Sequence, residues 1–364
     1  MENIFFLVGY GLLLFLVIGL GHKRVRNKAK DQPMSRLSVR DITVIIPFRN
    51  EKNNLEKVIK SLDAQRIKPE RILFINDHSE DEGPSIIRQL DHGLTLEVHS
   101  LPKDRYGKKE ALKLGITLAQ TPWILTLDAD VSFSHEYMEN LQSLSEADMW
   151  ILPVVVKGSS WRNYWQEWDV TMANAINVAC YGWFRPLMAS GANLLFKRSS
   201  YLAVGIEHHV HISSGDDMLL LRDFRIQGKD IRLFSEPELA VYTHCKTSFL
   251  PFFNQRMRWI SKSRAVNDQL ANRIGVFQFF LQAVFYVLFV LSLCQLMFLE
   301  AGLFFICKVA LEMYFFYPYF ARFKRFKSWV SLPFFHCMYP FLVVSFILGY
   351  WFFQPRWKGR RVKV

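Results

Sequence analysis

The stretch "ITVIIPFRNE" (residues 42–51) is an apolar, β-branched run that reaches a proline and then turns polar. Continuous apolar runs of this length are typical of strands that are buried on both faces of a parallel sheet. The segment that follows, "NLEKVIKSLDAQ" (54–65), repeats apolar residues at helical spacing. The stretch therefore predicts the first strand–helix unit of an α/β fold.

The same alternation continues as far as residue 130. Further strands are predicted in "RILFINDHSEDEG" (71–83), "LTLEVHSL" (94–101) and "WILTLDAD" (123–130), and further helices in "GPSIIRQL" (83–90) and "KKEALKLGITLAQ" (108–120). Strands that alternate with helices predict a doubly wound α/β domain. Ligands of such domains bind at the carboxyl ends of the strands, where the strand order reverses.

Acidic side chains stand at two of these strand ends. Asp77 follows the second predicted strand, and Asp128 and Asp130 follow the fourth. A single aspartate there is commonly a helix cap, but carboxylates that are brought together repel each other unless a cation lies between them. Oxygen ligands that leave open positions suit Mg²⁺ or Mn²⁺ bridging a diphosphate. The place of the Asp-Ala-Asp stretch, more than its composition, indicates a metal site.

Two later stretches have both an ordinary and a functional interpretation. "SSGDDMLLLRDF" (213–224) puts two acids at a predicted helix start, where capping is their ordinary role. "NQRMRWISKS" (254–263) comes just before an apolar region, where Arg and Trp ordinarily anchor a chain at the membrane interface. "WRNYWQEWD" (161–169) is typical of an amphipathic interface helix, which either lines an acceptor site or dips into the membrane.

Apolar residues are concentrated at the two ends of this 364-residue chain, which is 51% hydrophobic. The run "FFLVGYGLLLFLVIGL" (5–20) has no charge, and further membrane spans are predicted near 276–298, 302–320 and 331–353. Lys308 and Glu312 lie four apart in the third run, so either they pair inside a helix bundle or the span is shorter. The sequence thus predicts an anchor at 1–22, a catalytic domain at 40–265, a membrane region at 275–355 and a basic tail at 356–364.

Basic residues flank the apolar runs and predict the topology. The stretch "HKRVRNKAK" (22–30) follows the first run, whereas a signal peptide carries its positive charge before the run. We therefore expect an uncleaved anchor, a cytoplasmic catalytic domain and a multi-pass protein of the inner membrane. If the last run crosses fully, the tail "RWKGRRVKV" (356–364) lies outside, against the charge rule; Pro333 and Pro340 could instead bend that run into a re-entrant or interfacial element.

The basic clusters beside the apolar runs also account for the net charge of +12. Clusters of Lys and Arg beside membrane spans attract anionic lipid, so membrane lipids are expected partners and nucleic acid is not. The five cysteines form no Cys-x-x-Cys pair, which favours free thiols on the reducing side of the membrane.

Seven short motifs, each weak alone, occur in order between residues 42 and 263: "PFRNE", "INDHSED", "GKKEAL", "DAD", "GANLLFKRS", "GDD" and "QRMRW". With the membrane spans that follow, the chain resembles membrane-bound family 2 glycosyltransferases, and is similar to the cellulose and hyaluronan synthase group and its smaller bacterial relatives. The resemblance implies a GT-A type (Rossmann-like) nucleotide-sugar-binding domain plus transmembrane helices.

The resemblance also implies a role for each matching residue. Asp217 would be the general base, Arg258 would meet the diphosphate, and Asp130 with Asp128 would bind Mg²⁺ or Mn²⁺. The nucleotide sugar would be bound by Pro47, Asn50, Glu51, Asp77, Lys108, Asp128, Gln255 and Trp259. The sugar and acceptor site would be shaped by Gly191, Ala192, Asn193 and Asp216.

The function implied is metal-dependent, inverting transfer of a hexose from a nucleoside diphosphate sugar, with a UDP-sugar expected. The acceptor would be lipid-linked or a saccharide, in cell-envelope glycan or glycolipid synthesis. Two alternatives stay open: a processive synthase that exports its polymer, and an inactive scaffold subunit. The intact acids speak against the scaffold, since an inactive relative has no physical reason to keep them. His78, the "GDD" form and "ISKS" after Trp259 depart from the family pattern and weaken the processive alternative.

Overall fold

The computed structural model of the protein describes residues 2–30, 37–90, 93–204, 216–354, 356–357 and 360–361. For residues 27–30, 162, 216, 262–265, 356–357 and 361 the described part is the backbone alone. The chain forms two compact units. The first comprises residues 1–31, 158–187 and 267–345, and the second comprises residues 32–157, 188–266 and 346–364.

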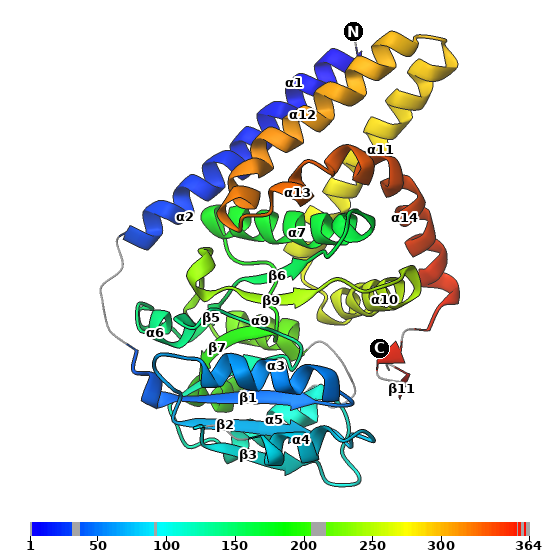
Figure 1. Ribbon diagram of the computed structural model, residues 1–364. Coiled ribbons are helices and arrows are strands. Elements are labelled where there is room, and N and C mark those ends of the chain that lie inside the picture. Colours follow the sequence, from blue (N-terminus) through cyan, green and yellow to red (C-terminus); the bar gives the residue numbers. More distant parts are fainter. Residues whose placement is uncertain are drawn as a thin grey trace. The chain divides into compact units, whose positions relative to one another are not determined.

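A seven-stranded mixed sheet forms the centre of the second unit, with the order β3-β2-β1-β4-β7-β5-β8. Figure 1 shows its first three strands side by side in blue and cyan. Their bounds are β1 Ile42–Phe48, β2 Arg71–Asn76, β3 Leu96–Ser100, β4 Trp123–Leu127, β5 Met149–Ile151, β7 Asn193–Lys197 and β8 Ile231–Leu233. The four predicted strands are present and run parallel to one another. The sequence analysis did not foresee β7, which is antiparallel to both β4 and β5.

The strand order reverses at β1, and this fixes where the polar loops meet. β1 pairs with β2 on one side and with β4 on the other. The connecting helices α3 (Lys52–Asp63), α4 (Gly83–Gln89) and α5 (Lys108–Leu118) agree with the predicted ones within a few residues. The carboxyl ends of β1, β2 and β4 therefore lie next to one another, at the switch point where α/β sheets bind ligands.

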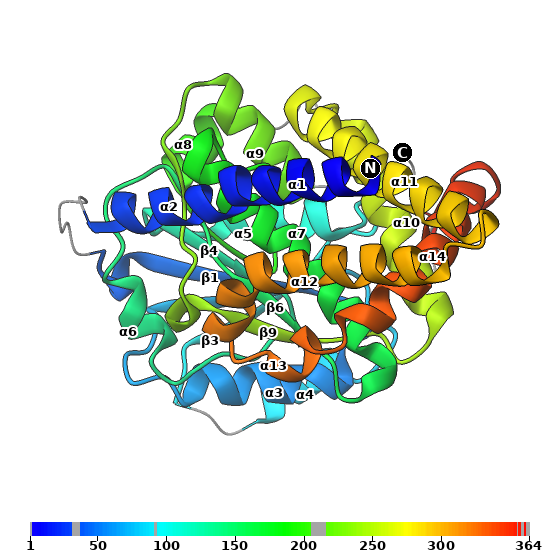
Figure 2. The same ribbon diagram turned by 90° about the horizontal axis from the view of Figure 1, so that it is seen from above.

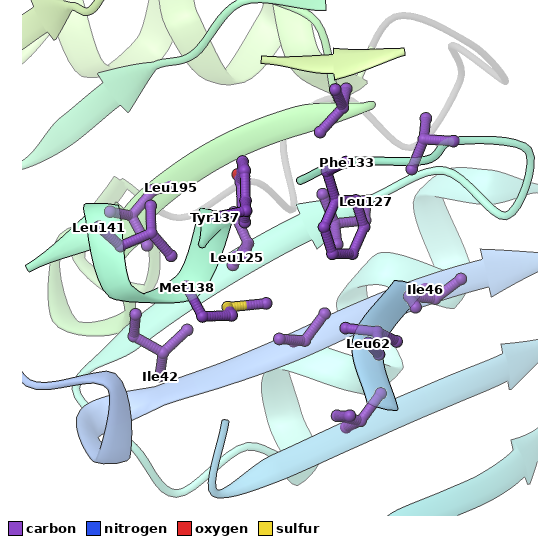
Figure 3. Close-up of a cluster of buried hydrophobic side chains, with 14 of the residues drawn as sticks. Ile42, Ile46, Leu62, Leu125, Leu127, Phe133, Tyr137, Met138, Leu141 and Leu195 are labelled. Atoms are coloured by element: carbon purple, nitrogen blue, oxygen red, sulfur yellow. The ribbon is translucent and has the colours of Figure 1, made fainter. Parts of the chain in front are cut away.

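The core beneath this edge is apolar and closely packed. Figure 3 shows Ile42 of β1 near Met138 and Leu125 of β4 near Tyr137 of α6 (Tyr137–Leu141), with Ile46 farther along β1. Each of these five side chains is fully buried. Burial of an aliphatic or aromatic side chain contributes roughly 2 kcal/mol, so this packing fixes the strands and hence the loops that follow them.

Smaller elements complete the second unit. β6 (Val154–Lys157) pairs with β9 (Val241–His244), and β10 (Arg356–Trp357) pairs with β11 (Arg360–Arg361) near the C-terminus. The helices are α8 (Arg198–Val204), α9 (Asp216–Ile226) and α10 (Phe249–Val266), with short 3₁₀ turns at η2 (Val39–Asp41) and η5 (Pro237–Leu239).

The first unit is helical. α1 (Glu2–Leu14), the π-helical turn η1 (Phe15–Gly19) and α2 (Leu20–Lys30) form one continuous helix, which Figure 2 shows in blue. The other elements are η3 (Trp161–Asn163), α7 (Tyr164–Trp183), α11 (Gln269–Cys294), α12 (Phe298–Arg322), α13 (Phe326–Trp329) and α14 (Leu332–Phe352), whose last residues belong to the second unit. α7 contains most of the predicted interface helix, which the sequence analysis had assigned to the catalytic domain.

Three helical segments of the described chain are long and apolar enough to cross a membrane: Glu2–Arg26, Gln269–Cys294 and Leu332–Phe352. The last is one helix that contains both Pro333 and Pro340. The predicted span at 302–320 is also helical, as part of α12, but it is not in this group. Its Lys308 and Glu312 form the predicted ion pair, 2.8 Å apart and fully buried.

Candidate active site

The loops that follow β1 and β2 hold each other in place. Arg49 donates from Nη1 to the carbonyl oxygens of Asp77 (3.0 Å) and His78 (2.8 Å), and from Nη2 to Glu80 (3.0 Å). The side-chain oxygen of Asn50 accepts from the Glu80 amide at 2.8 Å. Asn50 and His78 both have a left-handed backbone with φ of 52°, which asparagine tolerates better than most residues. This interlock fixes the backbone of Asp77.

Asp77 presents a buried carboxylate at the end of β2. The residue is 1% exposed, and its amide donates to the carbonyl of Phe48 at the end of β1 (2.9 Å). Its two carboxylate oxygens accept from Arg360, which comes from the C-terminal segment. The sequence analysis assigned Asp77 to the nucleoside and gave Arg360 no role.

Lys108 and Asp128 form an ion pair beside the end of β4. Gly107, with φ of 98°, precedes α5 in a conformation that residues with a side chain rarely adopt. That turn places Lys108 at the first position of the helix. Both side chains are partly exposed, 26% for the lysine and 36% for the aspartate, so both can also reach a ligand.

Asp130 lies among several charges. Its pKa is raised above the ordinary range, first by burial and then by the negative charge of Asp128. The charge of Glu51 raises the pKa further, whereas those of Lys246 and Lys108 lower it. Three predicted carboxylates therefore lie within electrostatic reach of one another. The sequence analysis missed Lys246, which follows β9 in "HCKTS" without a recognisable motif.

Asp217 and Lys108 meet at Gly191. The Gly191 amide donates to Oδ2 of Asp217 at 3.1 Å, and Oδ1 of Asp217 accepts from the Met218 amide at 2.8 Å. A Cβ placed on Gly191 would lie 3.3 Å from Nζ of Lys108 and 3.7 Å from Cβ of Asp217. The predicted base, the predicted diphosphate lysine and the predicted sugar-site glycine are thus immediate neighbours.

Arg258 on α10 is a desolvated cation close to this group. Burial lowers its pKa, and attraction to Asp128 opposes that shift. Within the described residues, its buried Nε has no hydrogen-bond partner. Buried donors ordinarily find an acceptor, so an unmatched donor on a desolvated cation is suited to an anionic ligand. Gln255 lies three residues before Arg258 on the same helix, and Trp259 directly follows Arg258. Gln255 and Trp259 are four positions apart and therefore share one face of the helix.

Some predicted residues lie elsewhere than expected. The side chain of Asn193 is fully buried: it accepts from the Tyr137 hydroxyl (2.5 Å) and donates to the carbonyls of Pro153 (2.8 Å) and Leu239 (2.9 Å). Its hydrogen bonds support β7 from within, so we correct the expectation that this side chain shapes the sugar site. Pro47 is buried inside β1, and Ala192 is 6% exposed. The Asp216 side chain lies outside the described part of the chain.

The acids at the end of β4 fit a divalent cation in chemical type. Asp128 and Asp130 offer hard oxygen ligands, and the pKa of Asp130, which is raised first by burial and then by the charge of Asp128, reflects a cost that a cation would relieve. Among the described residues, no group of three or more His, Cys, Asp or Glu side chains has the arrangement of a complete metal site. Two carboxylates suit an ion that takes its other ligands from a diphosphate and water.

Comparisons with known proteins bear on the family and the fold. Residues 43–205 match the family model described as glycosyl transferase family 2. A 4,4'-diaponeurosporenoate glycosyltransferase of Staphylococcus aureus (strain bovine RF122 / ET3-1) is 33% identical over 112 residues, which is 31% of this chain and 29% of the relative. The protein of the same description from strain USA300 is 34% identical over 92 residues, covering 25% of this chain and 24% of the relative. The chain thus matches less than a third of the length of these curated relatives.

A solved structure shows the same fold over nearly the whole chain. It is the mannosyltransferase PcManGT from Pyrobaculum calidifontis in complex with GDP-Man and Mn²⁺, with a TM-score of 0.54 and 16% identity over 95% of this chain and 99% of that one. The predicted GT-A type fold with additional apolar helices is confirmed. Over residues 43–205 this chain matches glycosyl transferase family 2, which agrees with the family resemblance of its motifs.

Proposed function

We propose that the protein is a membrane-bound glycosyltransferase that moves a sugar from a nucleoside diphosphate sugar, with a UDP-sugar as first candidate, to a lipid-linked or saccharide acceptor. The observation that carries the proposal is the meeting of Asp217 and Lys108 at Gly191, with Asp128 paired to Lys108 at the end of β4. A base, a cation and a carboxylate at one place are what transfer from a diphosphate requires.

The residues divide the chemistry between them. Lys108 and Arg258 bring positive charge to the position of the diphosphate, where negative charge develops as the bond to the sugar breaks. Asp217 accepts the proton of the attacking acceptor hydroxyl at one of its carboxylate oxygens. The Gly191 amide and the Met218 amide hold that carboxylate in a fixed orientation. Direct attack with a single base inverts the configuration at the anomeric carbon.

A divalent cation fits beside these groups. Asp128 and Asp130 would hold Mg²⁺ or Mn²⁺, which when bound supplies further charge stabilisation for the diphosphate. The neighbour PcManGT is described in complex with Mn²⁺, which supports a metal in this fold.

The acceptor and the location follow from the helices. Three helical segments can cross a membrane, and the Staphylococcus aureus relatives are named for a glycosyl transfer to 4,4'-diaponeurosporenoate. A membrane protein with a cytoplasmic catalytic unit and an apolar or lipid-linked acceptor accounts for both observations. A processive synthase remains a second candidate because of the resemblance to that group, and export of a polymer across the membrane would distinguish it.

The test is nucleotide release from a panel of UDP- and GDP-sugars by the full chain in detergent, with membrane lipid extract as acceptor. Release from one donor, supported by Mn²⁺ or Mg²⁺ and suppressed by a chelator, is the expected result. A folded preparation that releases nucleotide from no donor would overturn the proposal and favour the scaffold alternative. Equal release with and without the chelator would support the transferase activity but contradict its dependence on a metal.

A further inference from the structure

The C-terminal segment supplies an arginine to the nucleoside end of the candidate site. Nη1 of Arg360 on β11 lies 2.9 Å and 3.1 Å from the two carboxylate oxygens of Asp77. The two residues are 283 positions apart in the chain and belong to the same compact unit. The Asp77 side chain is 1% exposed and that of Arg360 is 31% exposed. The contact therefore joins a buried acid to a cation that still faces solvent.

The arginine is also held against an aromatic ring. Its guanidinium carbon lies 4.6 Å from the centroid of the Tyr106 ring, within the range of a cation–π interaction. The Tyr106 ring also lies 4.8 Å from the His78 ring. Nε2 of His78 in turn lies 3.0 Å from the carbonyl oxygen of Arg105. Tyr106 precedes Gly107 and Lys108, so Arg360 lies between the end of β2 and the start of α5.

A second arginine beside Asp77 has a different role. Arg49 binds the main-chain carbonyls of Asp77 and His78, and its remaining side-chain contact is with Glu80. Arg49 therefore shapes the loop, whereas Arg360 binds the carboxylate of Asp77. A buried carboxylate is costly without a compensating cation or donors, and Arg360 supplies both to Asp77 and orients its carboxylate.

We propose that Arg360 is a nucleoside-site residue of the transferase, which positions the Asp77 carboxylate and adds its guanidinium, backed by Tyr106, to the binding of the nucleoside diphosphate. The inference rests on the proposed function and extends it to the C-terminal segment. Both contacts to Asp77 come from Nη1, so the planar group can turn its other N–H donors toward an incoming ligand. Its positive charge favours a ligand that carries a diphosphate.

Charge and planarity make separate contributions that variants can distinguish. Arg360→Ala removes both and should raise the dissociation constant for UDP about 10- to 100-fold, as expected when one partner of a buried charged contact is lost. Arg360→Lys keeps the charge but lacks the planar, forked donor, so it should recover only part of the affinity. Because Arg360 acts in binding, KM for the donor should change more than kcat.

The experiment is titration of the full chain with UDP, and in parallel with GDP, in the presence of Mn²⁺. The set is wild type, Arg360→Ala, Arg360→Lys, Asp77→Asn, the double variant Arg360→Ala/Asp77→Asn, and Arg88→Ala as control. Arg88 is an exposed arginine on α4. The expected result is a double variant that binds only slightly more weakly than either single one, since the two residues act together.

Each other result overturns the inference. If Arg360→Ala binds UDP as tightly as wild type and only melts at a lower temperature, the arginine is structural. If it binds UDP more tightly, Arg360 competes with the nucleoside for Asp77. If wild type binds neither nucleotide, the proposed function fails and the inference fails with it, which separates that outcome from the other two.

Discussion

Gly191 lies at a crowded point of the candidate site. A Cβ there would lie 3.3 Å from the Lys108 ammonium, tighter than most real contacts, and 3.7 Å from Cβ of Asp217. The lysine end is flexible and can move aside, so the fold should tolerate a methyl group. The methyl group would occupy the space between Asp217, the predicted base, and Lys108, which is predicted to bind the diphosphate.

Gly191→Ala should therefore lower transfer about 10-fold or more, with little change in melting temperature. Steady-state nucleotide release and thermal unfolding would measure the two effects. Gly302→Ala is the matched control, because a Cβ on Gly302 of α12 meets nothing within 4 Å. Full activity of Gly191→Ala would show that the space around Gly191 is not used by the reactants.

Asp130 illustrates how a buried acid can cost stability. Its pKa is raised by burial and by Asp128, so the folded state binds a proton more readily than the unfolded state. At pH values above the ordinary aspartate pKa, the charged carboxylate therefore lowers the stability of the metal-free protein. This loss of stability disappears as the pH falls below that pKa.

Asp130→Asn should accordingly raise the melting temperature in chelator at neutral pH and abolish stabilisation by Mn²⁺. The gain should shrink when the scan is repeated near about pH 3, where most of the wild-type carboxyl is protonated in both states. A lower melting temperature for the variant at neutral pH, in the absence of metal, would contradict this account of the site.

At the scale of elements, the edge strand β3 is joined to β2 by a charged contact. Arg71 donates to both carboxylate oxygens of Glu97, and His99 lies 3.0 Å from the same carboxylate. The bond to Arg71 is the first cause that lowers the pKa of Glu97, from 4.5 to about 2. A depressed pKa stabilises the fold above the unfolded value, and this stabilisation is lost as the pH falls from about 4.5 towards 2.

Glu97→Gln should cost about 1 kcal/mol at neutral pH, a figure reduced for solvent screening because a third of the side chain is exposed. The difference from wild type should disappear as the pH falls to about 2. Thermal unfolding across this pH range would measure it. Glu56→Gln is the control, since Glu56 makes a fully exposed ion pair with Lys60 on α3. A cost for Glu97→Gln that is independent of pH would assign it to packing and not to charge.

The elements predicted from sequence were those with a strong local pattern. The strands β1, β2, β3 and β4 and the helices between them have clear apolar periodicity, and the structure confirms them. The antiparallel strand β7 was missed, because its place in the sheet depends on pairing with β4 and β5, which lie far from it in sequence. Lys246 and Arg360 were missed as site residues for the same reason: each reaches the site only through the fold.

At the scale of the molecule, the helical unit is held by a buried polar cluster. Lys308 and Glu312 of α12 pair at 2.8 Å, and Glu312 also contacts His336 of α14 (2.6 Å) and Tyr10 of α1. Gln282 of α11 accepts from Lys308 at 3.0 Å. Four helices from both ends of the chain thus share one network, in which every partner depends on the others.

Lys308→Met should lower stability by about 3 kcal/mol, because it leaves the buried Glu312 without its main counter-charge. The double variant Lys308→Met/Glu312→Gln should recover a large part of that loss, since neither charge remains buried. Melting temperatures in detergent would test this, with the exposed Lys327→Met as control. The charge explanation would be contradicted if the double variant lost more stability than the two single variants lose together.

The central claim is that Asp217 is the base of a glycosyl transfer at this sheet edge. The most direct measurement is UDP binding and sugar transfer, in one preparation each, of wild type, Asp217→Asn and the exposed control Asp41→Asn. The account predicts that Asp217→Asn binds UDP within about threefold of wild type but transfers at least about 100-fold more slowly, as loss of a general base requires. Transfer by Asp217→Asn at a rate close to wild type would contradict it.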